Sequence, residues 1–512
     1  MIHRPPRIAG ALQNILSWRN VLAGIAIVAA AFVWRGGLHF LGERIFIPLV
    51  AVFTVVTLVL LIVARARQGA ATLLAISLPL VAFGVIEAGW SIRPTQMVVL
   101  AILFVWLLGA RVDVRRIPLR GWLLLYLLSL AFATWWAIWH PPEITSVIPE
   151  AMAQRASAIR PLVQLFTATV ALAVFPVVTL AVDTETRLSH TVKGLLAITA
   201  VVCLYGIYQS FAVSLGLPLS DITWGVGIGN SAITNYGETR HYSGVVTSFA
   251  PRATFAESLH FGAYLAGIFP LCLACWLGRT SLPERWRHWP WRTLSLLLGL
   301  VLLLTFSRSS WAAAVVAISL VLLLSRRVRT WIVFAAGVGV AYAVFSLLAH
   351  LPIFESSLST AGLIAGRLSP EYLLIDPRII YIQVLSETAL SSPIWGIGLG
   401  NYAIAGASAL GLNVLLSAHS VWAAHWVEGG AIGLIVLLGL FAAIARRLAA
   451  GLRHLRRNEW YFPLLGLTAG IAAMSAQYIT WGDRFDPYFW FVIALAFAVI
   501  NIAMRPHTET TS

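Results

Sequence analysis

One short segment of the chain gathers side chains that could do acid–base chemistry. It runs from Ala418 to Leu434 and holds His419, His425 and Glu428 together with two tryptophans. A histidine titrates near neutral pH and can accept a proton from a substrate hydroxyl, or it can contact a phosphate. In a helix, His425 and Glu428 share a face because they are three residues apart. A histidine with no carboxylate nearby more often packs or caps, so both readings stand at this point.

Three arginines lie in short polar motifs that suit a phosphate ligand. Arg252 precedes an apolar run, Arg308 follows another, and Arg378 lies close to Asp376 in a long loop. A guanidinium binds phosphate through two parallel hydrogen bonds, which a lysine cannot reproduce. Each arginine also has an ordinary explanation, namely pairing with a carboxylate or reaching lipid headgroups. A site for a lipid-linked pyrophosphate would need two or three of them at headgroup depth.

Metal and nucleotide chemistry have weak support in the sequence. Cys272 and Cys275 form a CxxC pair, but no second pair of cysteines or histidines completes a zinc site, and Cys203 stands apart. We expect all three thiols to be buried and to act as small apolar residues. The chain contains no Walker A motif, and the glycines at 225–229 lack a strand–helix frame. We therefore predict neither a metal nor a cofactor.

The composition fixes the environment in which these residues must act. Of the 512 residues, 59% are hydrophobic and 11% are charged, against about 25% charged in an ordinary soluble domain. The mean hydropathy is +0.85. A soluble globule cannot hide that much apolar surface, which excludes cytosolic, disordered and disulfide-scaffold proteins. The chain is expected to be a membrane protein with many spans.

Apolar runs of about 20 residues give the expected architecture, an all-α polytopic membrane protein that forms a single transmembrane domain over residues 1–512. We predict about fourteen transmembrane helices, with twelve to fourteen as the range because two runs are short and close together. The runs lie near 19–34, 45–63, 70–90, 95–110, 121–139, 161–182, 193–217, 257–278, 293–306, 310–325, 330–349, 419–445, 460–480 and 487–504.

The positive charges orient the chain in the membrane. Lys and Arg total 35 against 20 Asp and Glu, a net charge of +15, and Lys193 is the only lysine. The cations cluster in alternate connecting segments, which by the positive-inside rule are cytoplasmic, as are both termini. No basic stretch is long enough for a nucleic-acid-binding domain, so we expect no nucleic-acid partner. Arg252, Arg308 and Arg378 fall in the opposite segments, on the outer side of the membrane.

Two loops on the outer side are long enough to carry function, one at 218–256 and a larger one at 350–418. The arginine motifs and the histidine segment lie in or beside these loops. The order of the motifs resembles the O-antigen ligase and O-antigen polymerase superfamily over about residues 240–440. The motifs that carry the resemblance are Arg252 to Phe255, Thr305 to Arg308, Asp376 to Arg378, Gly396 to Asn401, and His419 to Gly433. Ala253 departs from the pattern, since it stands where a Gly-Thr-Phe version has glycine.

The resemblance implies a metal-independent glycosyltransferase in the bacterial inner membrane, with its active site on the periplasmic face. Its donor would be a glycan on undecaprenyl pyrophosphate, and its acceptor would be lipid A–core for a ligase or a second lipid-linked glycan for a polymerase. By resemblance, Arg252, Arg308 and Arg378 bind the pyrophosphate. His419 activates the acceptor hydroxyl or contacts the pyrophosphate, and Glu428 assists or only orients a neighbour. Direct attack would invert the anomeric carbon.

A different class of function also fits a chain with many spans. A non-catalytic flippase for lipid-linked glycans, or a secondary transporter, would place ionisable residues near the middle of the bilayer. Here the charges that topology does not explain fall at the outer face, which favours the enzyme. The sequence leaves ligase and polymerase open.

Overall fold

The protein is a helical polytopic membrane protein, described here by a computed structural model. The structure describes residues 69–80, 94–109, 114–141, 150–212, 239–242, 245–249, 251–255, 258–327, isolated positions between 329 and 336, 378–411, 420–480 and 486–505. Four predicted features lie outside these residues: the spans at 19–34, 45–63 and 330–349, and His419.

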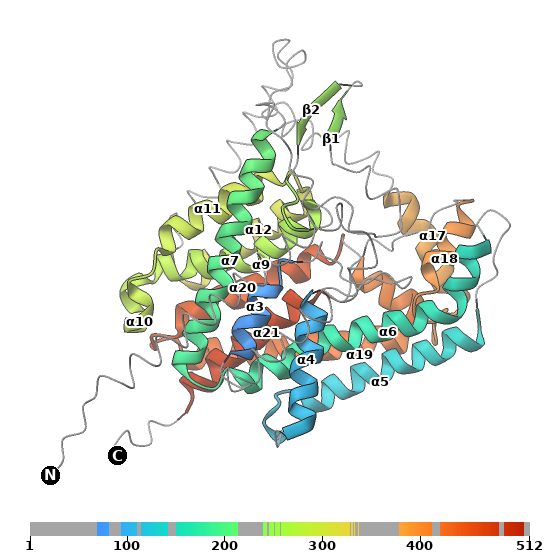
Figure 1. Cartoon of the computed structure of the whole chain (residues 1–512), viewed down its shortest axis with the longest axis horizontal. Coiled ribbons are helices and arrows are strands. Elements are labelled where there is room, and N and C mark those ends of the chain that lie inside the picture. Colours follow the sequence, from blue (N-terminus) through green and yellow to red (C-terminus); the bar gives the residue numbers. More distant parts are fainter. Residues whose placement is uncertain are drawn as a thin grey trace, which may run out of the picture.

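Most of the described helices fall within the predicted apolar runs, whereas helices at 284–287, 378–391 and 402–409 lie in segments that were predicted to be connections (Figure 1). Their bounds are α3 Ala70–Ser77, α4 Pro94–Gly109, α5 Arg120–Trp139, α6 Glu150–Ala181, α7 Glu185–Ala212, α9 Ser258–Leu277, α10 Glu284–Arg287, α11 Trp291–Leu304, α12 Arg308–Leu324, α17 Arg378–Ser391, α18 Tyr402–Ala409, α19 Val421–His454, α20 Tyr461–Gln477 and α21 Pro487–Ala503. Short 3-10 turns occupy Val114–Arg116 and Arg279–Ser281.

Five described helices are long and apolar enough to cross a membrane. They are α5, Ile159–Ala181 of α6, Glu185–Ser210 of α7, α9 and α19, and shorter apolar helices include α11, α12 and α21. The predicted count of about fourteen spans stays a prediction. Two strands, β1 Thr239–Tyr242 and β2 Val245–Phe249, pair antiparallel inside the predicted loop at 218–256, and the sequence analysis did not predict this pairing.

The helix α21 lies at the centre of the bundle. Every side chain from Pro487 to Ile500 is buried, as expected for a helix that is apolar on all sides. It packs against α6 and α20 and also touches α7, α9 and α19. By contrast, α5 exposes Leu124, Leu128 and Trp135 along one side, which suits a helix that faces lipid. Figure 1 shows α5 running beside α6 and α19 away from the densest part of the bundle.

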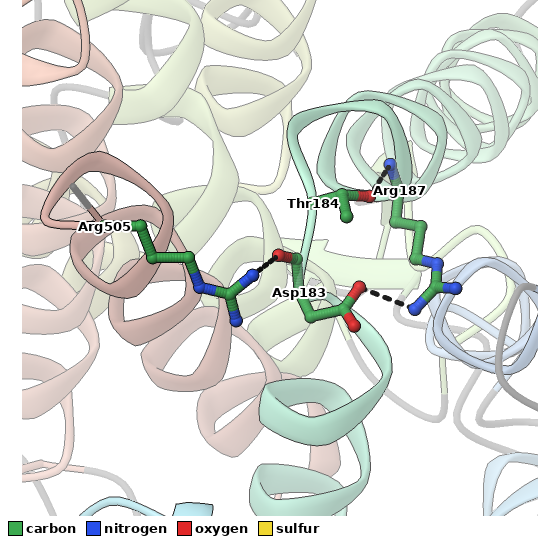
Figure 2. A network of polar contacts seen from close by, with 4 residues as sticks. All are labelled: Asp183, Thr184, Arg187 and Arg505. Carbon is green, nitrogen blue, oxygen red and sulfur yellow. Dashed lines mark hydrogen bonds and ion pairs between the residues drawn. The ribbon is translucent and has the colours of Figure 1, made fainter. Parts of the chain in front are cut away.

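Cationic residues from distant segments meet at one end of the bundle (Figure 2). Arg187 Nη1 pairs with Asp183 Oδ1 at 2.5 Å, and Arg505 Nη1 donates to the Asp183 carbonyl oxygen at 2.6 Å. At the same ends of α9 and α12, Arg327 Nη2 donates to the Leu277 carbonyl at 2.7 Å. The predicted cytoplasmic segments at 183–187, 326–329 and 505 therefore sit at matching helix ends, as an alternating topology requires.

Glycines allow α20 to press closely on α9. A Cβ at Gly470 would overlap the carbonyl oxygen of Gly267, and a Cβ at Gly466 would overlap the backbone of Leu271. In a membrane the lipid is as apolar as the helices, so hydrophobic burial does not drive two helices together. Small residues at such contacts let the helix backbones approach closely and pack by van der Waals contact. The same helix α9 buries Cys272 and Cys275 completely, and Cys203 on α7 is also buried, which confirms the expectation for the thiols.

Gly470→Ala is expected to destabilise the protein, because the added methyl group meets backbone atoms of α9 that cannot rotate away. Overpacking of this kind costs about 1–3 kcal/mol. Thermal unfolding of the purified protein in detergent should show a clearly lower midpoint. Gly121→Ala is the matched control, since a Cβ at Gly121 meets nothing within 4 Å. Equal midpoints for the two variants would contradict the close α9–α20 contact.

Candidate functional site

The predicted histidine segment begins with a defined helix start. Ser420 caps α19, with its side-chain oxygen accepting from Ala423 N at 3.3 Å, and α19 begins at Val421. Val421 N donates to the Tyr478 carbonyl oxygen at 2.9 Å, so the start of α19 is tied to the end of α20. His419 precedes this cap in the sequence and lies outside the described residues.

The second histidine of the segment uses both of its ring nitrogens inside the protein. His425 is buried, and its Nδ1 lies 2.8 Å from the Val421 carbonyl oxygen. A carbonyl oxygen can only accept, so Nδ1 carries the proton, and Nε2 accepts from the Tyr126 hydroxyl at 2.8 Å. His425 therefore joins α19 to α5 as a packing and hydrogen-bonding residue. Of the two readings that the sequence left open for a histidine here, the structural one fits His425.

Glu428 lies one turn further along α19 and holds a loop of backbone. Its carboxylate is buried, and its two oxygens accept from Gly400 N at 2.8 Å and from Tyr402 N at 3.3 Å. Tyr402 is the first residue of α18, so the negative charge also faces the positive end of that helix. These contacts fit the orienting role that the resemblance allowed for Glu428. They connect α19 to the glycine motif, which is remote from it in sequence.

The glycine motif folds as a tight loop against α19 and α5. Gly396, Gly398 and Gly400 all have positive φ, at +75°, +94° and +81°, a backbone conformation that glycine adopts without strain. The amides of this loop do not converge on one point, because Gly396 N donates to the Ser392 carbonyl and Gly398 N donates to the backbone carbonyl of Glu428. Only Gly400 N, together with Tyr402 N beyond it, reaches the Glu428 carboxylate. These amides are used within the protein, so among the residues described the motif is not a phosphate cradle.

The close approach of this loop to α19 also explains one glycine of that helix, Gly430. Gly430 breaks the helix with φ +63°, and a Cβ there would overlap the carbonyl of Ile394. On the other side, Leu399 N donates to the Ala133 carbonyl at 3.0 Å. At Gly430 the close neighbour is the loop, and at Gly429 a Cβ would meet nothing within 4 Å.

Arg252 lies in a buried turn at the mouth of α9. Its side chain is 2% exposed, and Ala253 after it has a φ of +49°. The turn is fixed by Gln209 of α7, whose Oε1 accepts from Ala253 N at 2.7 Å. Thr254 Oγ1 donates to the Pro79 carbonyl at 2.5 Å. Gln209 was missed by the sequence analysis, although a glutamine inside an apolar run is itself unusual.

Arg308 is the first residue of α12 and follows the capping residue Ser307. The Ser307 side chain accepts from Ser310 N at 3.4 Å and from Ser310 Oγ at 2.8 Å. An arginine at a capped helix N-terminus adds to the positive potential of the helix dipole, which favours an anion.

The turn with Arg252 and the start of α12 are brought together by α9. Phe255 stacks on Phe261 with ring centroids 5.4 Å apart. The next residue, Gly262, faces Ser310 and Thr305, and a Cβ there would overlap the Ser310 side chain. The structure thus brings the Arg252 and Arg308 motifs to the same end of α9. Arg378 begins α17, which packs against α18 and α19, and its side chain lies outside the described residues.

Aromatic side chains gather at the end of α5 that contacts the glycine loop. His140 stacks on Trp136 with centroids 3.8 Å apart, and Phe132 lies 5.6 Å from Trp395 of the loop. Trp139 at the last turn is 69% exposed. The opposite end of α5 begins at Arg120. Tryptophans at one end of a 20-residue apolar helix and arginines at the other are typical of a helix that spans a bilayer.

Residues 293–438 match the family model described as O-antigen ligase. Over this region the chain is similar to the O-antigen ligase family. The match confirms the resemblance drawn from the motifs and covers those of Arg308, Arg378, the glycine loop and α19. The Arg252 turn lies before the matched residues. A search of curated proteins finds no match to the chain.

Within the O-antigen ligase region, Glu428→Ala is expected to destabilise the loop that carries the glycine motif. The change leaves two buried backbone N–H groups without their acceptor, which costs about 1–3 kcal/mol for each group. Hydrogen exchange of the purified variant should rise over residues 396–402. Glu387→Ala is the control, since Glu387 is exposed on α17. Unchanged exchange in the Glu428 variant would contradict the anchoring role.

Ala253→Gly is expected to stabilise the protein, unlike an Ala→Gly change within a helix. A non-glycine residue in the left-handed region costs about 1–2 kcal/mol, and part of this is offset by the larger entropy of an unfolded glycine. The unfolding midpoint should rise slightly. Ala266→Gly inside the buried helix α9 serves as the comparison and should lower it. A fall of equal size in both variants would mean that the turn at Ala253 carries no strain.

Proposed function

We propose that the chain is a periplasmic-face glycosyltransferase that moves a glycan from undecaprenyl pyrophosphate to an acceptor hydroxyl. One observation carries the proposal. The Arg252 turn, the arginine-bearing start of α12 and the capped start of α19 meet at one end of the bundle, opposite the basic helix ends at Asp183 and Arg505. The match of residues 293–438 to the O-antigen ligase family supports the same reaction class.

The site suits a donor glycan that is already attached to its leaving group, the lipid-linked pyrophosphate. The aromatic end of α5 contacts the glycine loop and is typical of the level of the lipid headgroups, where a lipid-linked pyrophosphate resides. Arg252, Arg308 and Arg378 are the proposed pyrophosphate ligands. They would neutralise the charge that develops on the leaving group. The loops at 218–256 and 350–418 would then frame the site on the periplasmic side, with both termini in the cytoplasm.

The proposed reaction is a single displacement at the anomeric carbon. The acceptor oxygen forms a bond to that carbon while the bond to the pyrophosphate oxygen breaks, and the leaving undecaprenyl pyrophosphate keeps the electron pair. The acceptor proton passes to a base, and the configuration inverts. His419 is the proposed base or pyrophosphate contact, because His425 has both ring nitrogens engaged. Glu428, in the second turn of α19, acts indirectly by holding the loop that carries the glycine motif.

The test uses the purified full chain with a glycan on undecaprenyl pyrophosphate, with and without lipid A–core. Transfer only with the core identifies a ligase, and chain growth without it identifies a polymerase. His419→Ala should lower the rate by about 10²–10⁴-fold if His419 is a general base. Arg308→Ala and Arg378→Ala should each lower it by about 10²–10³-fold if they stabilise the leaving group.

Matched controls exist at the opposite helix ends. His454→Ala, at the far end of α19, and Arg447→Ala, on its exposed face, should leave the rate unchanged. Full activity of His419→Ala, Arg308→Ala and Arg378→Ala would refute the assignment of these residues. Movement of the lipid-linked glycan across a bilayer without transfer would identify a flippase instead.

A further inference from the structure

The last turn of α20 connects the two helix starts that the proposed reaction requires. The Tyr478 carbonyl oxygen accepts from Val421 N at 2.9 Å and from Ser420 Oγ at 3.4 Å. The preceding residue, Gln477, donates from Nε2 to Ser310 Oγ at 3.0 Å. Since these two residues are consecutive, a single peptide unit sets the separation between the start of α12 and the start of α19.

The connection continues from Gln477 to the residue that precedes Arg308. Ser310 Oγ donates to Ser307 Oγ at 2.8 Å, and Ser307 caps α12. Gln477 and Ser310 are almost fully buried, with exposures of 2% and 0%. Water cannot readily replace hydrogen bonds in such a place, so the chain of contacts holds its geometry.

The end of α20 is itself firmly held. Gly466 and Gly470 press α20 against the backbone of α9. Tyr478 stacks edge-on against Phe489 of α21 with centroids 5.0 Å apart, and its hydroxyl donates to Asp486 Oδ2 at 3.3 Å. A displacement of the start of α12 relative to α19 would therefore have to break contacts with α9 or α21.

A packing role alone does not explain a glutamine at position 477, because burying its polar side chain costs free energy. Its Oε1 is buried and has no hydrogen-bond partner within the part of the chain that the structure describes. An unmatched carbonyl in the interior costs free energy that an apolar side chain of similar size avoids. The amide N–H to Ser310 is the contact that methionine, which has the same length, would not provide.

We propose that Gln477 is a positioning residue that sets where Arg308 stands relative to the start of α19, and so sets the affinity for the lipid-linked pyrophosphate. This inference rests on the proposed function. Gln477 lies outside the residues matched by the O-antigen ligase family and outside the region at 240–440 that carries the resemblance. It acts through Ser310 and Ser307 and does not touch the substrate.

The test measures binding of undecaprenyl pyrophosphate to the full-length protein in nanodiscs, together with its unfolding midpoint. Gln477→Met should weaken binding about tenfold, the scale of one lost hydrogen bond, while the midpoint changes little. Ser310→Ala removes the same bridge from its other end and should give the same loss. Ser475→Ala is the control, because its hydroxyl bonds within α20 to the Ile471 carbonyl.

A double-mutant cycle separates positioning from general loss of structure. In an Arg308→Ala background, Gln477→Met should have no further effect on binding, since the residue that it positions is gone. The same loss in both backgrounds, or a lower midpoint with unchanged binding, would overturn the positioning role. If the wild-type protein does not bind undecaprenyl pyrophosphate, the proposed donor is wrong, and this inference falls with it.

Discussion

The arrangement at the candidate site depends on the buried carboxylate of Glu428. A stretch of irregular backbone beside apolar helices must find partners for every N–H group, since hydrocarbon offers none. Both oxygens of Glu428 accept from this stretch, at Gly400 and at Tyr402. The negative charge also complements the N-terminal end of α18. One side chain on α19 thus lets a non-helical loop lie against two long helices, and that loop leads back to α17, which begins at Arg378.

A second constraint is the close contact of helix backbones around α9. Gly470 and Gly466 of α20 meet the α9 backbone, and Gly262 of α9 meets the start of α12. These contacts leave no room for independent movement of the helix ends. They bring the Arg252 turn, the start of α12 and the end of α20 into one assembly, to which Tyr478 attaches α19. The proposed substrate site is therefore built on rigid helix termini, where a guanidinium can be held at a fixed position.

For one histidine and one glycine motif, the structure decides between roles that the sequence left open. His425 and His419 stand in one segment, but His425 is engaged by Tyr126 and by the Val421 carbonyl. The glycines at 396–400 could have formed an anion-binding loop, but Gly396 N and Gly398 N donate to backbone carbonyls and Gly400 N donates to the Glu428 carboxylate. Spacing alone does not distinguish these cases, because the partner of His425 lies on α5 and the partner of the glycine loop lies on α19, each distant in the chain.

The sequence by itself determined the class of the protein. Hydropathy and alternating arginine clusters required a polytopic helical membrane protein, since apolar length and charge asymmetry act locally. The motif order was enough to indicate the O-antigen ligase superfamily. Only the tertiary structure decided which side chains hold the site together. Gln209, Gln477 and the hairpin at 239–249 escaped the sequence analysis. Their importance depends on long-range hydrogen bonds and strand pairing, for which one chain without its fold gives no pattern.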